Sequence, residues 1–187
     1  SSSKARPRTR LNSTDSVAVL VLVLVLAALL ASAVASGLSA PPRGWGVLTY
    51  HLPRAVSWLQ HGDLGAYGPE AAFYPGNAEL LVLMGLFTGT DRLVPLIQAP
   101  FLLLAALALF ALARTIGARR WSAAIASLVF VASPMAFFHS TVAKNDLIVT
   151  ALVLSGVLFL LRSLGPDSRR NTRVWEISLA GLSLGLA

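Results

Sequence analysis

The sequence predicts an all-α integral membrane protein with about five transmembrane helices, and three observations lead to that prediction. The chain has 187 residues, of which 56% are hydrophobic and only 12% are charged, a composition that a soluble domain does not have. Its apolar residues form runs near the roughly 20 residues that a helix needs to cross a bilayer. Its basic residues cluster at the ends of these runs, which argues against the nucleic-acid partner that a net charge of +7 would suggest.

The apolar runs give the expected order of helices. The first run, Ser16 to Pro42, carries no charge, and its length excludes the strand that the Val-Leu alternation at 19–26 suggests. The same run has features of a cleaved signal peptide, with basic residues before it and small residues at 31–35. We expect a basic cytoplasmic tail at 1–15 and transmembrane helices over residues 17–38, 93–113, 121–138, 145–162 and 175–187. The chain begins with Ser and ends within an apolar pattern, so we interpret it as the amino-terminal part of a longer transmembrane domain.

The distribution of basic residues predicts the topology. The tail at 1–15, the turn at 114–120 and the loop at 162–173 hold eleven of the fifteen Lys and Arg residues. By the positive-inside rule these segments face the cytoplasm, and the N-terminus lies inside. The loop at 43–92 then lies on the outer side of the cytoplasmic membrane, where it is the longest polar segment of the chain.

The outer loop is expected to contain two short helices that lie in the membrane interface. Pro53 suits the first turn of the first helix, and Trp58 suits the interfacial depth. On this helix Leu52, Ala55, Val56 and Leu59 form the predicted apolar face, and His51, Arg54 and Gln60 face away from it. The second helix is predicted to begin with Asn77 as its cap and to run to Phe87, which is too short to span a bilayer.

Acidic residues at the outer ends of the helices are the candidate catalytic groups. Asp146 follows Lys144 and Asn145 at the start of the 145–162 helix, where the helix dipole favours an acid even without a function. Ionisable residues at such a membrane position are often functional. Glu79, Asp63 and Glu70 are further candidate general bases, although a lone loop acid is usually only solvated.

Several kinds of site are absent from the sequence or left open by it. The chain has no cysteine, which excludes disulfides and thiolate ligands, and it has no P-loop or GxGxxG motif. His51 and His61 are ten residues apart, a spacing that fits no metal-binding pair on a helix, so we assign no metal ligand and leave a divalent metal open. Arg54, Arg92 and Lys144 are outer cations that can hold a phosphate or anchor the chain at the interface.

Three segments on the outer side carry a resemblance to a known family. Residues 45–54 read W-G-V-L-T-Y-H-L-P-R, residues 74–81 read Y-P-G-N-A-E-L-L, and residues 140–147 read S-T-V-A-K-N-D-L. Together they resemble bacterial integral-membrane glycosyltransferases of the GT-C fold, the protein O-mannosyltransferase and aminoarabinose-transferase-like group. The resemblance covers most of the chain after the tail and matches the amino-terminal membrane module of that family.

The resemblance implies a function and a set of site residues. Members of the family transfer a sugar from a polyprenyl-phosphate donor to an acceptor glycan, lipid or protein outside the cytoplasmic membrane, with a carboxylate as general base. The acid on the later outer loop of the family matches Asp146, and we take Glu79 as a second candidate catalytic residue. We expect substrate contacts from His51, Arg54, Tyr50, Lys144 and Asn145.

One position departs from the family pattern. Members are expected to carry an Asp directly after the Trp of the first motif, where this chain has Gly46. That departure keeps a second interpretation open. In it the chain is a non-catalytic multi-pass membrane protein, such as a transporter, an assembly subunit or a transferase that has lost its loop acid.

Overall fold

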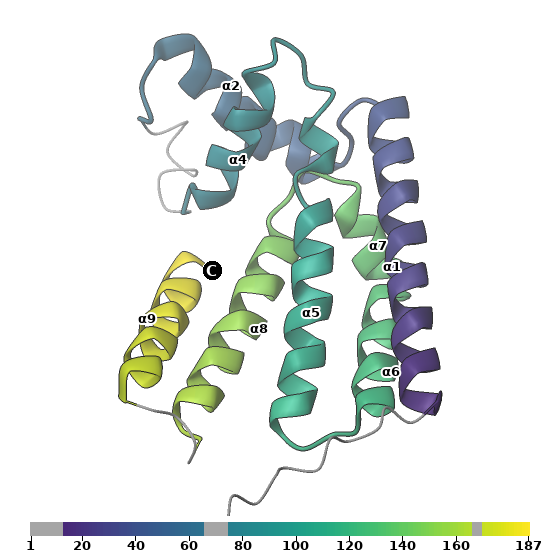
Figure 1. Cartoon of the computed structure of the whole chain (residues 1–187). Helices are drawn as coiled ribbons and strands as arrows, with labels where there is room; N and C mark the ends of the chain where they lie inside the picture. The colour runs from purple at the N-terminus through teal and green to yellow at the C-terminus, as the bar shows by residue number, and fades with distance from the viewer. Residues whose placement is uncertain (1–12, 66–74, 166–169) are drawn as a thin grey trace, which may run out of the picture.

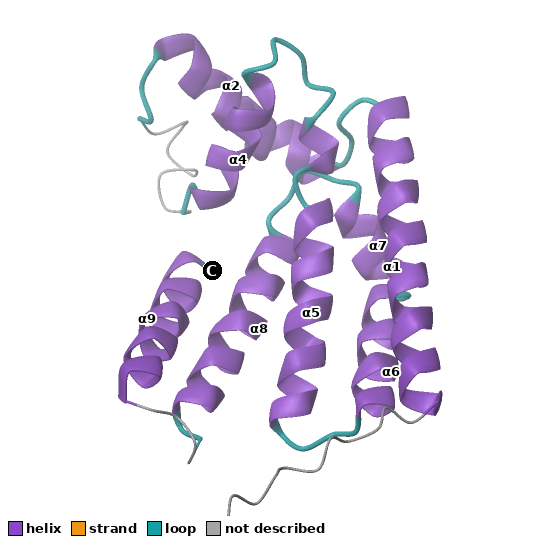
Figure 2. Cartoon of the chain, in the orientation of Figure 1, coloured by secondary structure: helices purple, strands orange, loops and turns teal. Residues whose placement is uncertain are grey.

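The computed structural model describes residues 13–65, 75–165 and 170–187, and in these segments it contains helices and no strand (Figures 1 and 2). Helices α1 (Ser13–Ser39), α6 (Arg120–Val131), α5 (Ala99–Thr115), α8 (Asp146–Ser163) and α9 (Arg170–Leu186) lie side by side in that order. Helices α2 (Leu52–His61) and α4 (Asn77–Leu86) lie together across one end of this bundle. The predicted all-helical fold is therefore confirmed for the described residues.

Three described helical stretches are long and apolar enough to cross a membrane: Ser13–Ser39, Val94–Thr115 and Asp146–Ser163. The second of these joins the short 3-10 helix η2 (Val94–Leu96) to α5. Helix α9 begins five residues before its predicted start and, with 17 residues, is not among these candidate spans.

The single helix predicted over 121–138 is broken in the structure. Helix α6 ends at Val131, and α7 (Pro134–Ser140) follows after a bend of 65°. Proline has no N–H to donate and disfavours helical backbone in the residue before it. Ser133 accordingly has extended backbone, and its hydroxyl accepts a 3.2 Å hydrogen bond from the Ala136 N–H as a cap for α7. The bend directs α7 toward the start of α8.

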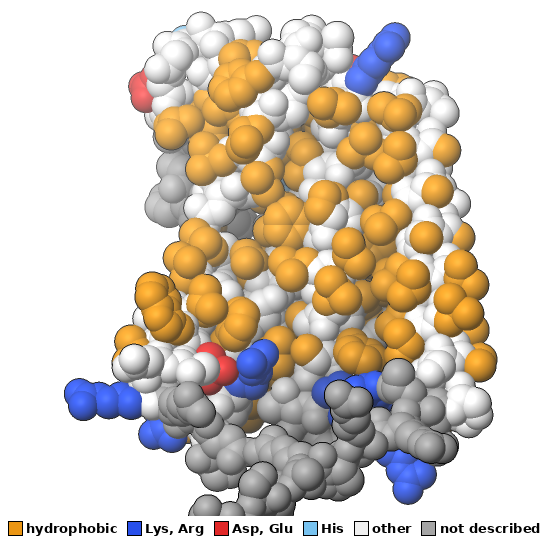
Figure 3. All heavy atoms as spheres, in the orientation of Figure 1, with side chains coloured by type: hydrophobic (Ala, Val, Ile, Leu, Met, Phe, Trp, Pro, Cys, Tyr) orange, Lys and Arg blue, Asp and Glu red, His pale blue; other side chains and the backbone are white. Residues whose placement is uncertain are grey.

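Small residues allow the helices of the bundle to approach one another closely. Ala106 on α5 and Ala124 on α6 belong to one buried cluster, and the buried Ser127 hydroxyl donates a 3.1 Å hydrogen bond to the Ala106 carbonyl. Close packing of small residues, with occasional hydroxyl bonds between helices, is typical of membrane bundles. Large apolar side chains such as Leu107 and Val129 are exposed, and hydrophobic side chains cover the visible side of the bundle (Figure 3). A soluble protein rarely exposes so large an apolar surface, so this side is suited to lipid.

The two ends of the bundle differ in charge. The first residues of α1, α6 and α9 and the last residues of α5 and α8 lie at one end (Figure 1). The described basic residues next to these termini are Arg114, Arg119, Arg120, Arg162, Arg170 and Arg173. The opposite end carries α2, α4 and the segment before α8, and it contains every predicted site residue that the structure describes.

Candidate functional site

Helices α2 and α4 bury polar side chains where they pack together. A π-helical turn, η1 (Val47–His51), leads directly into α2. His51 is only 2% exposed and Arg54 only 7%, so the prediction that these two residues face away from the buried side was wrong. The reason is that α4 covers this side of α2, and the pattern of one helix does not reveal its neighbour. The π-helical turn also changes the angular position of His51 relative to the residues of α2.

Arg54 and Trp58 of α2 lie beside Gly76, at the start of α4. The Arg54 guanidinium carbon lies 4.9 Å from the centre of the Trp58 ring, a cation–π arrangement. The Trp58 indole N–H donates a 2.9 Å hydrogen bond to the Gly65 carbonyl, and the ring is buried. A Cβ on Gly76 would lie 2.7 Å from the Trp58 ring, so this contact needs glycine. Arg54 therefore packs on Trp58 of its own helix, beside Gly76 at the start of α4, and it does not line the pockets described below.

His51 and Glu79 form a buried pair between these helices. Nδ1 of His51 lies 2.8 Å from Oε1 of Glu79, and each residue is 2% exposed. Glu79 lies in the first turn of α4. This helix begins at Asn77, with Gly76 in the cap position, so the prediction that Asn77 is the cap was wrong by one residue. Within the described part of the chain, the second carboxylate oxygen of Glu79 is buried and accepts no hydrogen bond.

The segment before α8 is held in place by a buried amide side chain. Gln98 is fully buried; its Nε2 donates a 2.9 Å hydrogen bond to the Val142 carbonyl, and its Oε1 accepts a 2.6 Å hydrogen bond from the Leu147 N–H. These two bonds flank Lys144, Asn145 and Asp146, and they fix where α8 begins.

Replacing Gln98 with Met is expected to destabilise the protein by about 2–4 kcal/mol, because two buried backbone groups lose their partners while the volume is nearly kept. A lower midpoint of thermal unfolding in detergent measures this loss. Ser127→Ala, which removes one buried hydroxyl bond, serves as the comparison and should cost about 1 kcal/mol. Equal midpoints for Gln98→Met and the unmodified protein would show that these two bonds do not fix the segment.

Asp146 lies in the first turn of α8 and contacts the end of α7. Its Oδ2 lies 3.1 Å from Nδ1 of His139, and its side chain is 47% exposed. The bend before α7 brings His139 to this position. Asn145 occupies the cap position of α8, but its side chain makes no capping hydrogen bond. The side chain lines the pockets instead.

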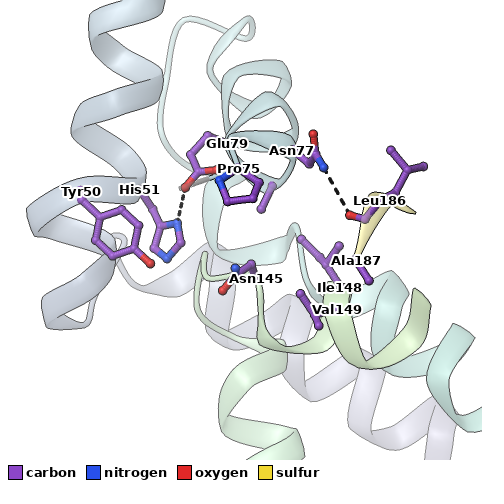
Figure 4. Close-up of a pocket in the computed structure, with 11 residues that line it drawn as sticks. Tyr50, His51, Pro75, Asn77, Glu79, Asn145, Ile148, Val149, Leu186 and Ala187 are labelled. Carbon is purple, nitrogen blue, oxygen red and sulfur yellow. Dashed lines mark hydrogen bonds and ion pairs between the residues drawn. The ribbon is translucent and has the colours of Figure 1, made fainter. Parts of the chain in front are cut away.

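Two adjoining pockets bring most of the predicted site residues together. The Glu79 pocket, of about 140 Å³, is lined by Glu79, Asn77 and Ile148 among others (Figure 4). The Asp146 pocket, of about 370 Å³, is lined by Asp146 and Lys144 among others. The two pockets share a wall of three residues, which are Tyr50, His51 and Asn145. Of the seven predicted site residues, all except Arg54 therefore line one pocket or both.

The remaining candidates lie elsewhere. Asp63 is exposed and accepts a hydrogen bond from the Gly65 N–H, and Glu70 lies outside the described residues. His61 is exposed at the end of α2. Among the described residues, no three His, Asp or Glu side chains form a group that could hold a metal ion. The sequence analysis assigned no site role to Gln98 or His139. For Gln98, a lone amide inside an otherwise apolar run was the feature that could have indicated a buried structural role.

Comparison with known proteins identifies no relative: no family model matches the chain, and neither a curated protein nor a solved structure matches it.

Proposed function

We propose that the protein is a membrane glycosyltransferase that moves a sugar from a polyprenyl-phosphate donor to an acceptor. The observation that carries the proposal is the pair of adjoining pockets, because they gather two carboxylates, a lysine and a histidine at one end of an apolar helical bundle. A concave site with a few convergent ionisable groups is the usual form of an active site.

The reaction is proposed to take place on the outer side of the cytoplasmic membrane. The arginine-rich end of the bundle faces the cytoplasm under the positive-inside rule, which puts both pockets outside. Trp45, which lines the Asp146 pocket, is 81% exposed, and Leu48 and Leu59 are exposed at the same end. Such an apolar rim suits the membrane interface, where a polyprenyl chain can stay in the bilayer while its phosphate reaches Lys144.

The proposed transfer inverts the configuration of the sugar. The acceptor oxygen attacks the anomeric carbon as the bond from that carbon to the phosphate oxygen breaks, and the phosphate leaves with the electron pair. Lys144 stabilises the negative charge of the departing phosphate. A general base that depends on one of the two pocket carboxylates, Asp146 or Glu79, accepts the proton of the acceptor hydroxyl.

Gly46 lines the Asp146 pocket, and the structure has room for an acid there. Its backbone is helical, and an added Cβ would lie 3.6 Å from Cε1 of Tyr50 and 3.7 Å from Cε of Lys144, which are ordinary contact distances. Gly46→Asp is therefore expected to fold normally and to place a carboxylate beside Lys144.

The test is transfer of labelled sugar from a series of polyprenyl-phosphate donors by membranes that contain the whole protein. We expect transfer by the unmodified protein. Transfer by Gly46→Asp alone would mean that the pockets are intact but the base is lost. If neither the unmodified protein nor Gly46→Asp transfers sugar from any donor, although each is folded in the membrane, the result would favour a non-catalytic membrane protein instead.

A further inference from the structure

We propose that His51 and Glu79 form a proton-accepting dyad, in which Nε2 of His51 takes the proton of the acceptor hydroxyl and Glu79 orients the imidazole ring. This inference rests on the glycosyl transfer proposed above and assigns its general base. It makes His51 the catalytic residue and Glu79 a positioning residue.

The buried contact between the two side chains fixes which ring nitrogen is free. A carboxylate only accepts hydrogen bonds, so Nδ1 of His51 carries the hydrogen in its 2.8 Å contact with Oε1 of Glu79. In the neutral ring Nε2 then carries the lone pair. Among the described residues none makes a hydrogen bond to Nε2, which points away from Glu79 in Figure 4. Because His51 lines both pockets, this lone pair is available to a bound hydroxyl.

The arrangement of the pockets matches the geometry of an inverting transfer. Inversion requires the attacking oxygen and the departing phosphate to lie on opposite faces of the anomeric carbon. Among the described residues, Lys144 and Asp146 line the Asp146 pocket alone, whereas Glu79 lines the other pocket alone. With an anomeric carbon at the shared wall and its phosphate toward Lys144, Glu79 lies on the side of attack, and His51 reaches that side from the shared wall. Asp146 lies on the side of the leaving phosphate.

In the transfer step, the proton of the acceptor and the charges that develop are all taken up by the leaving phosphate and by His51, Glu79 and Asp146. As the acceptor oxygen forms its bond to the anomeric carbon, its proton moves to Nε2 of His51, and the electron pair of the broken bond leaves with the phosphate. The resulting imidazolium carries a positive charge next to the Glu79 carboxylate, which stabilises it; the side chains of both residues are only 3% exposed. Asp146 faces the positive charge that develops at the anomeric carbon, and it does not take the proton.

The kinetic test compares His51→Gln and Glu79→Gln with the unmodified protein in membranes. Loss of a general base typically costs about 10²- to 10⁴-fold, so kcat should fall by roughly that factor in His51→Gln, with a smaller change in the KM for the donor. The matched control is His61→Gln, since His61 is an exposed histidine whose Nδ1 contacts only Ser57 of its own helix among the described residues. Imidazole added to His51→Ala should restore part of the activity, which a merely structural role of His51 would not predict.

The tautomer of His51 gives a second readout that does not depend on activity. In protein with ¹⁵N-labelled histidine, NMR should find the hydrogen of His51 on Nδ1, and Glu79→Gln should shift that signal while His61→Gln leaves it unchanged. A hydrogen on Nε2 would overturn the dyad, as would full activity of His51→Gln in a protein that transfers sugar. If the unmodified protein transfers sugar from no donor, the proposed function fails and the dyad fails with it.

Discussion

Replacing Asp146 with Asn is expected to slow sugar transfer by roughly 10²- to 10³-fold, the usual cost of removing one group that stabilises charge in a transition state. The side chain lines the Asp146 pocket beside Lys144 and is half exposed, so a ligand can reach it. The effect should appear in kcat, because the positive charge at the anomeric carbon develops only as the phosphate departs. The measurement is transfer at saturating donor by membranes with equal amounts of each protein.

The fold should tolerate this change, which makes the kinetic result interpretable. Asn is nearly the same size as Asp, and loss of an acid from the first turn of a helix costs about 0.3–1 kcal/mol. Asp91→Asn is the matched control, because Asp91 is an exposed acid at the same end of the bundle and lines neither pocket. If Asp146→Asn transfers sugar as fast as Asp91→Asn does, the carboxylate of Asp146 has no role in the reaction.

The helices of this protein could be predicted from sequence because their signal is local. An apolar run of about 20 residues without charge has few alternatives to a long helix, and α1 and α5 follow such runs. The break before Pro134 was harder to predict from the sequence, since prolines also occur near the ends of unbroken membrane helices. The break depends on the extended backbone of Ser133 and on the hydrogen bond by which its side chain caps α7. Both depend on how the residues after Ser133 pack.

The site was harder to predict because its residues come from separate segments. The motif residues of 45–54, 74–81 and 140–147 drew attention to the end of the bundle where the two pockets lie, yet no local pattern joins His51 to Glu79. The same limit explains Arg54, which was expected to contact substrate. A charged residue on a short amphipathic helix is usually solvated, and only the packing of α4 over α2 buries this one against Trp58.

The buried amide of Gln98 is a feature that the sequence predicts only in part. A lone amide in an apolar run must find partners, because an unpaired polar group in such a setting costs several kcal/mol. The partners here are backbone groups of Val142 and Leu147, more than 40 residues away, as the separations of 44 and 49 residues show. The sequence indicates that the Gln98 amide must form hydrogen bonds, but it does not identify the partners. In this fold the partners flank the segment that carries Asp146.

Lys144→Met is expected to lower transfer by roughly 10- to 100-fold, because it removes the cation that faces the departing phosphate but keeps the length of the side chain. The loss should be smaller than for a fully buried donor, since Lys144 is partly exposed and solvent screens its charge. Lys144→Arg should retain most of the activity, because it keeps the charge at nearly the same place.

The matched control for this cation is Arg92→Met, which removes an exposed charge from the same end of the bundle outside both pockets. Equal losses in Lys144→Met and Arg92→Met would mean that the general positive field of this end draws in the anionic donor. A loss confined to Lys144→Met and reversed in Lys144→Arg would place the phosphate in the Asp146 pocket. With the leaving group on that side, an inverting attack comes from the opposite face of the anomeric carbon, where the proposal puts the Glu79 pocket.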